Sequence, residues 1–155
     1  MQENIEIYEK AKRYFLSGLK HIELEEWLEA EIQFKESLYL IPGRLSTLTN
    51  LSATLIKLEK YNEAKEIINE CLKIEPHNSQ AILNKGLIFK LEKEYERAIE
   101  TFDCLIKNNP EYAEAYNNRG IMLHYLKKNN EALSDFNRAI SIMRSEEHTS
   151  ELQSH

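Results

Sequence analysis

The stretch that decides the fold is residues 79–112, SQAILNKGLIFKLEKEYERAIETFDCLIKNNPEY. It contains two segments with the apolar spacing of amphipathic helices, joined by a short polar turn and followed by Asn-Pro. The same residue types return when the window moves by 34 residues in either direction. A fixed period of this length is typical of a repeat protein, so the stretch predicts one unit of an array.

Five sets of residues recur at this spacing. The small residues are Gly18, Ser52, Gly86 and Gly120. The alanines are Ala30, Ala64, Ala98 and Ala132. The large apolar residues are Phe34, Ile68, Phe102 and Phe136. The aromatic set is Trp27, Tyr61 and Tyr95, followed by Asn129, and the proline set is Pro42, Pro76 and Pro110, followed by Arg144. Small residues suit a close helix crossing, and proline ends a helix, so the sets predict packed helix pairs.

This pattern resembles the tetratricopeptide repeat, in four units that cover residues 11–143. The units are 11–44, 45–78, 79–112 and 113–143. The links within a unit are only two or three residues long, which favours antiparallel helices. The resemblance implies an all-α fold, a right-handed α-solenoid of antiparallel helix pairs (the TPR superhelix), whose concave face is lined by the first helix of each pair. We expect first helices near 11–24, 45–58, 79–92 and 113–126, and second helices near 27–40, 61–74, 95–108 and 129–143.

The two ends of the chain depart from the repeat. Residues 1–10 keep helical apolar spacing and predict an N-terminal extension of the first helix. Residues 144–155, RSEEHTSELQSH, resemble the translation of a common sequencing adapter, so we expect an artefactual tail rather than a domain. Residues 1–143 are then expected to be a fragment of a longer protein. A last helix without a solvating cap predicts self-association through the C-terminal end.

Composition narrows the class of function. Hydrophobic residues make up 42% and charged residues 30% of the 155 residues, and the formal net charge is −6. The acidic balance argues against nucleic acid as a partner. The sequence shows neither a long apolar run nor a signal peptide, so we expect no membrane partner. Cys71 and Cys104 form no CxxC pair, which favours reduced thiols and a cytoplasmic protein.

The most informative candidate site is a further set at the same spacing, Asn50, Asn84 and Asn118. Each lies on a first helix, two residues before the small residue of its unit. A row of amides can hydrogen-bond the backbone of an extended peptide. The row also resembles the asparagine ladder in the repeat arrays of O-GlcNAc transferases, which implies peptide contact. The alternative is a structural role, in which each amide bonds between neighbouring helices.

Other candidate residues flank this row. Ala53, Leu87 and Ile121 form an apolar strip, and the polar candidates beside it are Asn117, Lys90 and His124. The expected partner is therefore a protein or peptide ligand in the concave groove. A carboxylate clamp for acidic chaperone C-termini is disfavoured, because its positions hold Ser46, Gln80 and Glu114.

The sequence carries no recognisable set of catalytic residues. The sequence has no HExxH, no cysteine–histidine cluster at zinc spacing and no glycine-rich phosphate loop. We therefore expect no enzyme activity, no cofactor and no metal in this chain. The favoured function is a scaffold or adaptor that binds protein. The alternative is the substrate-recruiting N-terminal region of an enzyme, with an O-GlcNAc-transferase-like glycosyltransferase as the leading candidate.

Overall fold

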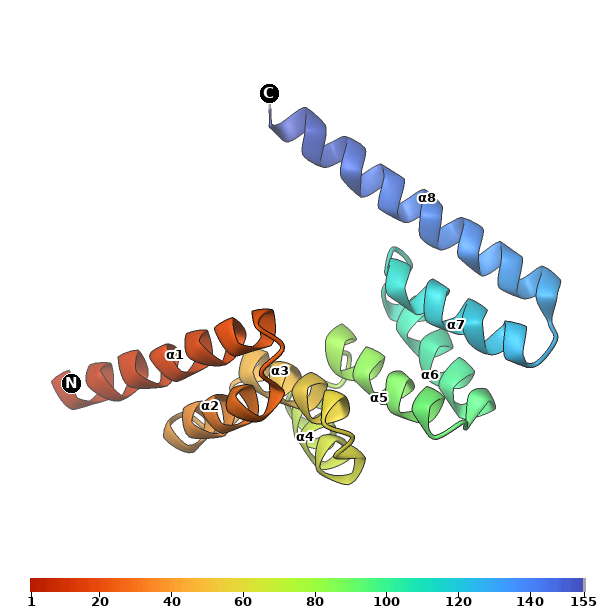
Figure 1. Ribbon diagram of the computed structural model, residues 1–155. Helices are drawn as coiled ribbons and strands as arrows, with labels where there is room; N and C mark the ends of the chain where they lie inside the picture. The colour runs from red at the N-terminus through yellow and green to blue at the C-terminus, as the bar shows by residue number, and fades with distance from the viewer. Residues whose placement is uncertain (155) are drawn as a thin grey trace. The chain divides into compact units, whose positions relative to one another are not determined.

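The computed structural model describes residues 1–154 as α-helices joined by short turns (Figure 1). The helices are α1 (Gln2–Glu23), α2 (Trp27–Leu40), α3 (Leu45–Lys57), α4 (Tyr61–Ile74), α5 (Ser79–Leu91), α6 (Tyr95–Asn108), α7 (Ala113–Tyr125) and α8 (Asn129–Gln153). The described part of the chain has no strand. The fold is all-α and of the α-solenoid class, as the repeat pattern predicts. His155, the last residue of the expected tail, lies outside the described residues.

The chain forms two compact units, and the boundary between them falls within α5, after Asn84. In the first unit, α1 packs on α2, α2 on α3, and α3 on α4. In the second unit, α6 packs on α7, and α7 on α8. The odd-numbered helices are the first helices of the repeats, and the even-numbered ones are the second helices.

Each first helix ends in the same turn. Glu25, Glu59, Lys93 and Lys127 all have positive φ, between 58° and 62°, and they are spaced by 34 residues. In the first of these turns the amide of Glu25 donates to the carbonyl of Ile22, and that of Glu26 donates to His21. These two backbone hydrogen bonds together form a Schellman motif, which reverses the direction of the chain within three residues. The turns therefore hold each helix pair antiparallel.

The small-residue set and the large apolar set meet inside each helix pair. A Cβ atom added to Gly18 would lie 2.5 Å from Cε1 of Phe34. One added to Gly86 would lie 2.5 Å from Cε1 of Phe102, and the same contact recurs between Gly120 and Phe136. Glycine is needed here because the phenylalanine ring occupies the space of a side chain.

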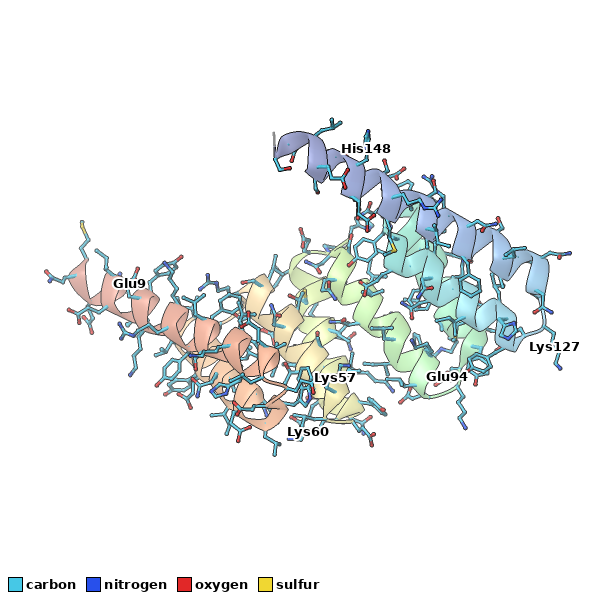
Figure 2. The ribbon with its side chains drawn as sticks, turned by 45° about the horizontal axis from the view of Figure 1, so that its top comes forward. Glu9, Lys57, Lys60, Glu94, Lys127 and His148 are labelled. Atoms are coloured by element: carbon cyan, nitrogen blue, oxygen red, sulfur yellow. The ribbon has the colours of Figure 1, made fainter. Side chains whose placement is uncertain are left out.

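Alanine and proline take the roles that their spacing predicts. All four repeat alanines are buried, with at most 2% of their surface exposed. α2, α4 and α6 each end two residues before a proline. Where Arg144 replaces that proline, α8 continues to Gln153, so the expected helix end at residue 143 is too early. Figure 1 shows this part of α8 extending past α7, and His148 lies on it (Figure 2).

Buried ion pairs link the helices within each unit. In the first unit Glu31 of α2 is 5% exposed and accepts hydrogen bonds from Lys35 and from Lys60 in the α3–α4 turn. In the second unit Arg119 of α7 donates to both carboxylate oxygens of Asp135 on α8, at 2.8 and 2.7 Å. Because these charges are paired, their burial is tolerated.

Candidate peptide-binding surface

Asn84 lies near the middle of α5 and is buried, with 1% of its surface exposed. Its Nδ2 donates to the carbonyl oxygen of Thr49 at 3.3 Å and to Oγ of Ser52 at 2.8 Å, both on α3. Its Oδ1 accepts from Gln80 at 3.1 Å. Three of the four hydrogen bonds that an amide can make are thus formed within the protein. Asn84 makes the inter-helix bonds expected for a structural role.

Asn118 on α7 is 7% exposed and joins α7 to α5 within the second unit. Its Oδ1 accepts a hydrogen bond of 2.8 Å from Nζ of Lys90, and its Nδ2 donates to the carbonyl of Glu114. Burial lowers the pKa of Lys90, and the nearby charge of Glu114 partly opposes this. Lys90 is therefore a half-buried ammonium group on a neutral partner, with two donors left for other acceptors.

Asn50 on α3 is the most open member of the row. It is half-buried, and its Nδ2 donates to the carbonyl of Ser46 one turn earlier, at 2.7 Å. Its Oδ1 has no hydrogen-bond partner among residues 1–154. The three asparagines therefore differ in what they can offer to a ligand, although they share one position in the repeat. Peptide contact by any of them stays a prediction.

The remaining candidates lie on the same helices. Ala53 on α3 is half-buried, as are Leu87 on α5 and Ile121 on α7. Asn117 and His124 on α7 are exposed. Nδ1 of His124 pairs with Oδ1 of Asn129 at 3.0 Å, which leaves Nε2 directed elsewhere. The first unit holds Asn50, Ala53 and Asn84, and the second unit holds Leu87, Lys90, Asn117, Asn118, Ile121 and His124.

One residue that sequence reasoning missed is Arg44, immediately before α3. Its guanidinium carbon lies 5.6 Å from the ring centroid of Tyr8 and 5.2 Å from that of Phe15, both on α1. The signal was present in the repeat: the equivalent residues are Lys10, Asn78 and Tyr112, so an arginine occurs there only before this unit.

Residues 1–154 lack two further features. They contain no group of three or more His, Cys, Asp or Glu side chains that could hold a metal ion. Among the helices described, none is both long and apolar enough to cross a membrane.

Comparison with protein families gives three matches. Two profiles of the tetratricopeptide repeat match residues 113–145 and 79–112. A third, the Fis1 C-terminal tetratricopeptide repeat, matches residues 51–91. No curated protein matches the chain by sequence.

Several solved structures share the fold. MamA (residues 41 to the end) from Desulfovibrio magneticus RS-1 is similar with a TM-score of 0.74 and 20% identity, over 87% of this chain and 76% of that one. YrrB, described as a TPR protein with an unusual peptide-binding site, has a TM-score of 0.68 and 21% identity, over 94% of this chain and 75% of that one. The first TPR of Spaghetti (RPAP3), bound to the HSP90 peptide SRMEEVD, has a TM-score of 0.70 and 18% identity, over 77% of this chain and 95% of that one. The three profile matches together cover residues 51–145, and with the paired helices they show that the chain belongs to the tetratricopeptide repeat family.

Proposed function

We propose that the chain is a protein-interaction scaffold that binds an extended peptide segment on the open sides of its first helices. Membership of the tetratricopeptide repeat family supports this proposal. Two of the structures that share its fold are described through peptide binding, YrrB and the Spaghetti domain. Binding of this kind needs no catalytic group, since recognition alone is the activity.

The observation that carries the proposal is the mixed surface of α5 and α7 in the second unit. Leu87 and Ile121 are half-buried, so each still offers apolar surface to a ligand side chain. Asn117 and His124 are exposed on α7, and Lys90 keeps free donors. Apolar surface with polar groups at its edge can bury a peptide side chain and hydrogen-bond the peptide backbone.

The first unit supports the proposal through α3. Asn50 has an unused carbonyl oxygen, which can accept a hydrogen bond from a peptide N–H. Ala53, one turn further along α3, is small enough to let a peptide backbone approach. We assign Asn84 a supporting role in this unit, because its amide is engaged with α3.

Selection from a random heptapeptide library displayed on phage tests the proposal. We expect the unaltered protein to enrich peptides, and the double change Leu87→Ala and Ile121→Ala to reduce capture by roughly tenfold, the effect of about 1.4 kcal/mol of lost apolar contact. Tyr39→Ala with Ile74→Ala is the matched control, because it removes exposed apolar side chains from second helices. Equal capture by the test variant and the unaltered protein, with helical content retained, would refute the proposed surface.

The asparagine row needs a separate variant. Asn84→Ala would leave buried groups of α3 without a partner, so a loss of binding would not distinguish contact from unfolding. Asn50→Ala avoids this problem, and we expect it to weaken capture by about two- to tenfold, the effect of one net hydrogen bond. The glycosyltransferase alternative stays a prediction, which the sequence of the intact gene would test.

A further inference from the structure

Arg44 is held in place by two aromatic rings. Its guanidinium contacts Tyr8 and Phe15, which lie two turns apart on α1. Both distances fall within the roughly 6 Å over which a cation is attracted to a ring face. Tyr8 belongs to the N-terminal extension, so this segment helps to fix the orientation of the arginine. A fixed guanidinium loses less side-chain entropy when it binds a ligand.

The same guanidinium has no acceptor of its own. Nη1 of Arg44 is buried and has no hydrogen-bond partner in the described residues. No carboxylate of residues 1–154 pairs with it, unlike Arg119, which contacts two aspartates in the second unit. Arginine carries five N–H donors, and leaving the buried Nη1 without an acceptor is costly. Buried polar groups normally have a partner, so an unsatisfied one is a candidate position for an ordered water or an ion.

The surroundings of Arg44 favour an anion rather than a neutral partner. α3 follows directly, and its first turn has neither a side-chain cap nor an acidic residue. The first backbone N–H groups of an uncapped helix carry partial positive charge. By contrast, α5 is capped by Asn78, whose Oδ1 accepts from the amide of Ala81 at 2.9 Å. A second buried group, the hydroxyl of Thr47, also lacks a partner in this turn of α3.

We propose that Arg44 binds the carboxylate of an aspartate or glutamate side chain in the peptide ligand, beside the start of α3. This proposal rests on the proposed function and deepens it, because it names the chemical class of ligand that the first unit takes. A carboxylate matches the planar fork of a guanidinium and forms short, charge-assisted hydrogen bonds with it. Asn50 follows six residues after Arg44 on α3, so the proposal places the ligand along the first half of this helix.

The first test needs no peptide. Sodium acetate replaces sodium chloride at constant ionic strength, and NMR follows the Nε–Hε signal of Arg44 and the amides of Leu45 and Ser46. We expect shifts that saturate with acetate. Arg44→Met should reduce the amide shifts at least fivefold, and Arg44→Lys should retain part of them, because lysine keeps the charge without the fork. Arg13→Met, an exposed arginine of the same unit, is the matched control and should leave them unchanged.

The second test uses the displayed heptapeptide library, in which peptides have no free C-terminus. Peptides captured by the unaltered protein should be enriched in Asp and Glu at least threefold, and Arg44→Met should remove that enrichment while still capturing peptides. Captured peptides without acidic enrichment, or acetate shifts equal in the unaltered and Arg44→Met proteins, would overturn the assignment of Arg44. A library that yields no peptides would instead refute the proposed function, and the acetate titration would then decide on Arg44 alone.

Discussion

Gly86 and Phe102 show how single residues set the spacing of a helix pair. The ring of Phe102 is fully buried and fills the place where a side chain at residue 86 would begin. The second repeat solves the same problem differently, since Ser52 there stands opposite the smaller Ile68 in the repeat pattern. A larger side chain at the first position is thus matched by a smaller one sixteen residues later, and the helices still cross closely.

We predict that Gly86→Ala lowers the free energy of unfolding by about 1–3 kcal/mol, because the new methyl group overlaps the Phe102 ring. Adding Phe102→Ile should recover part of that loss, as in the repeat that pairs Ser52 with Ile68. Urea denaturation of both single variants and the double variant measures the coupling. Strictly additive effects would mean that the two residues do not compete for the same space.

The asparagine row shows that the same residue type at the same repeat position can have different hydrogen-bond partners. The 34-residue spacing predicts correctly that Asn50, Asn84 and Asn118 occupy one position on successive first helices. Their contacts differ because neighbouring residues differ. Asn84 finds the hydroxyl of Ser52, whereas Asn118 finds the ammonium group of Lys90. Spacing alone cannot separate a structural amide from a free one, since the outcome depends on the adjacent helix.

At the scale of helices and turns, a residue just after each first helix has a left-handed backbone conformation that does not suit its residue type. Glutamate and lysine fill positions that glycine usually takes at helix ends. The left-handed conformation costs a residue with a Cβ atom roughly 1–2 kcal/mol. The turn forms nevertheless, because the packing of each helix pair requires it.

We predict that Glu59→Gly raises the free energy of unfolding by about 0.5–1 kcal/mol, since relief of the left-handed strain exceeds the added entropy of the unfolded chain. Glu59 is exposed, so the change removes little packing. Urea denaturation provides the measurement, and Glu59→Ala is the control. Alanine keeps the Cβ atom and should bring no gain, so an equal gain in both variants would contradict the explanation.

The ion pair between Glu31 on α2 and Lys60 in the α3–α4 turn should make the stability of the protein depend on pH. Burial acts to raise the pKa of Glu31, but the hydrogen bonds and charges of Lys35 and Lys60 outweigh it, so that the pKa lies below its ordinary value of 4.5. A carboxyl group with a lowered pKa stabilises the folded state above its unfolded pKa. That contribution is lost as the pH falls below about 4.5 and through the folded pKa.

Glu31→Gln should therefore cost about 1–2 kcal/mol at pH 7, the scale of hydrogen bonds to a charged group. The difference from the unaltered protein should shrink as the pH falls from 5 to 3, because Glu31 then becomes neutral as well. Denaturation at several pH values measures this. Glu63→Gln, at an exposed pair with Lys35, should show little change at any pH. A constant cost for Glu31→Gln across the range would exclude the ionic explanation.

For the whole molecule, the repeat makes the fold predictable because one packing rule is applied four times. Helix ends at Leu40, Ile74 and Asn108 follow from the proline two residues later. α8 does not end at the equivalent position, because Arg144 stands in place of the proline and allows the helix to continue. Arg44 does not follow from the repeat either, because its importance depends on Tyr8 and Phe15 reaching it from α1. Sequence patterns thus predict what recurs, and miss what a single unit does differently.

The open face of α8 leads to a prediction about assembly. Leu133, Ile140 and Met143 are 59%, 47% and 54% exposed. Leu133 and Ile140 are equivalent to Ile99 and Ile106 on α6, which are half-buried in the second unit, where α7 packs on α6. No helix among residues 1–154 is described on the corresponding face of α8. A continuous apolar strip of this kind favours association with a second copy.

We predict concentration-dependent dimerisation, seen in sedimentation velocity as a shift to a faster species as the protein concentration rises. Changing Leu133, Ile140 and Met143 together to serine should abolish that shift, because it removes the apolar surface while the buried side of α8 is left intact. Tyr39→Ser removes a highly exposed aromatic side chain from α2 and should leave the shift unchanged. A monomer at all concentrations would show that the strip is too small to repay the entropy of association, which costs several kcal/mol.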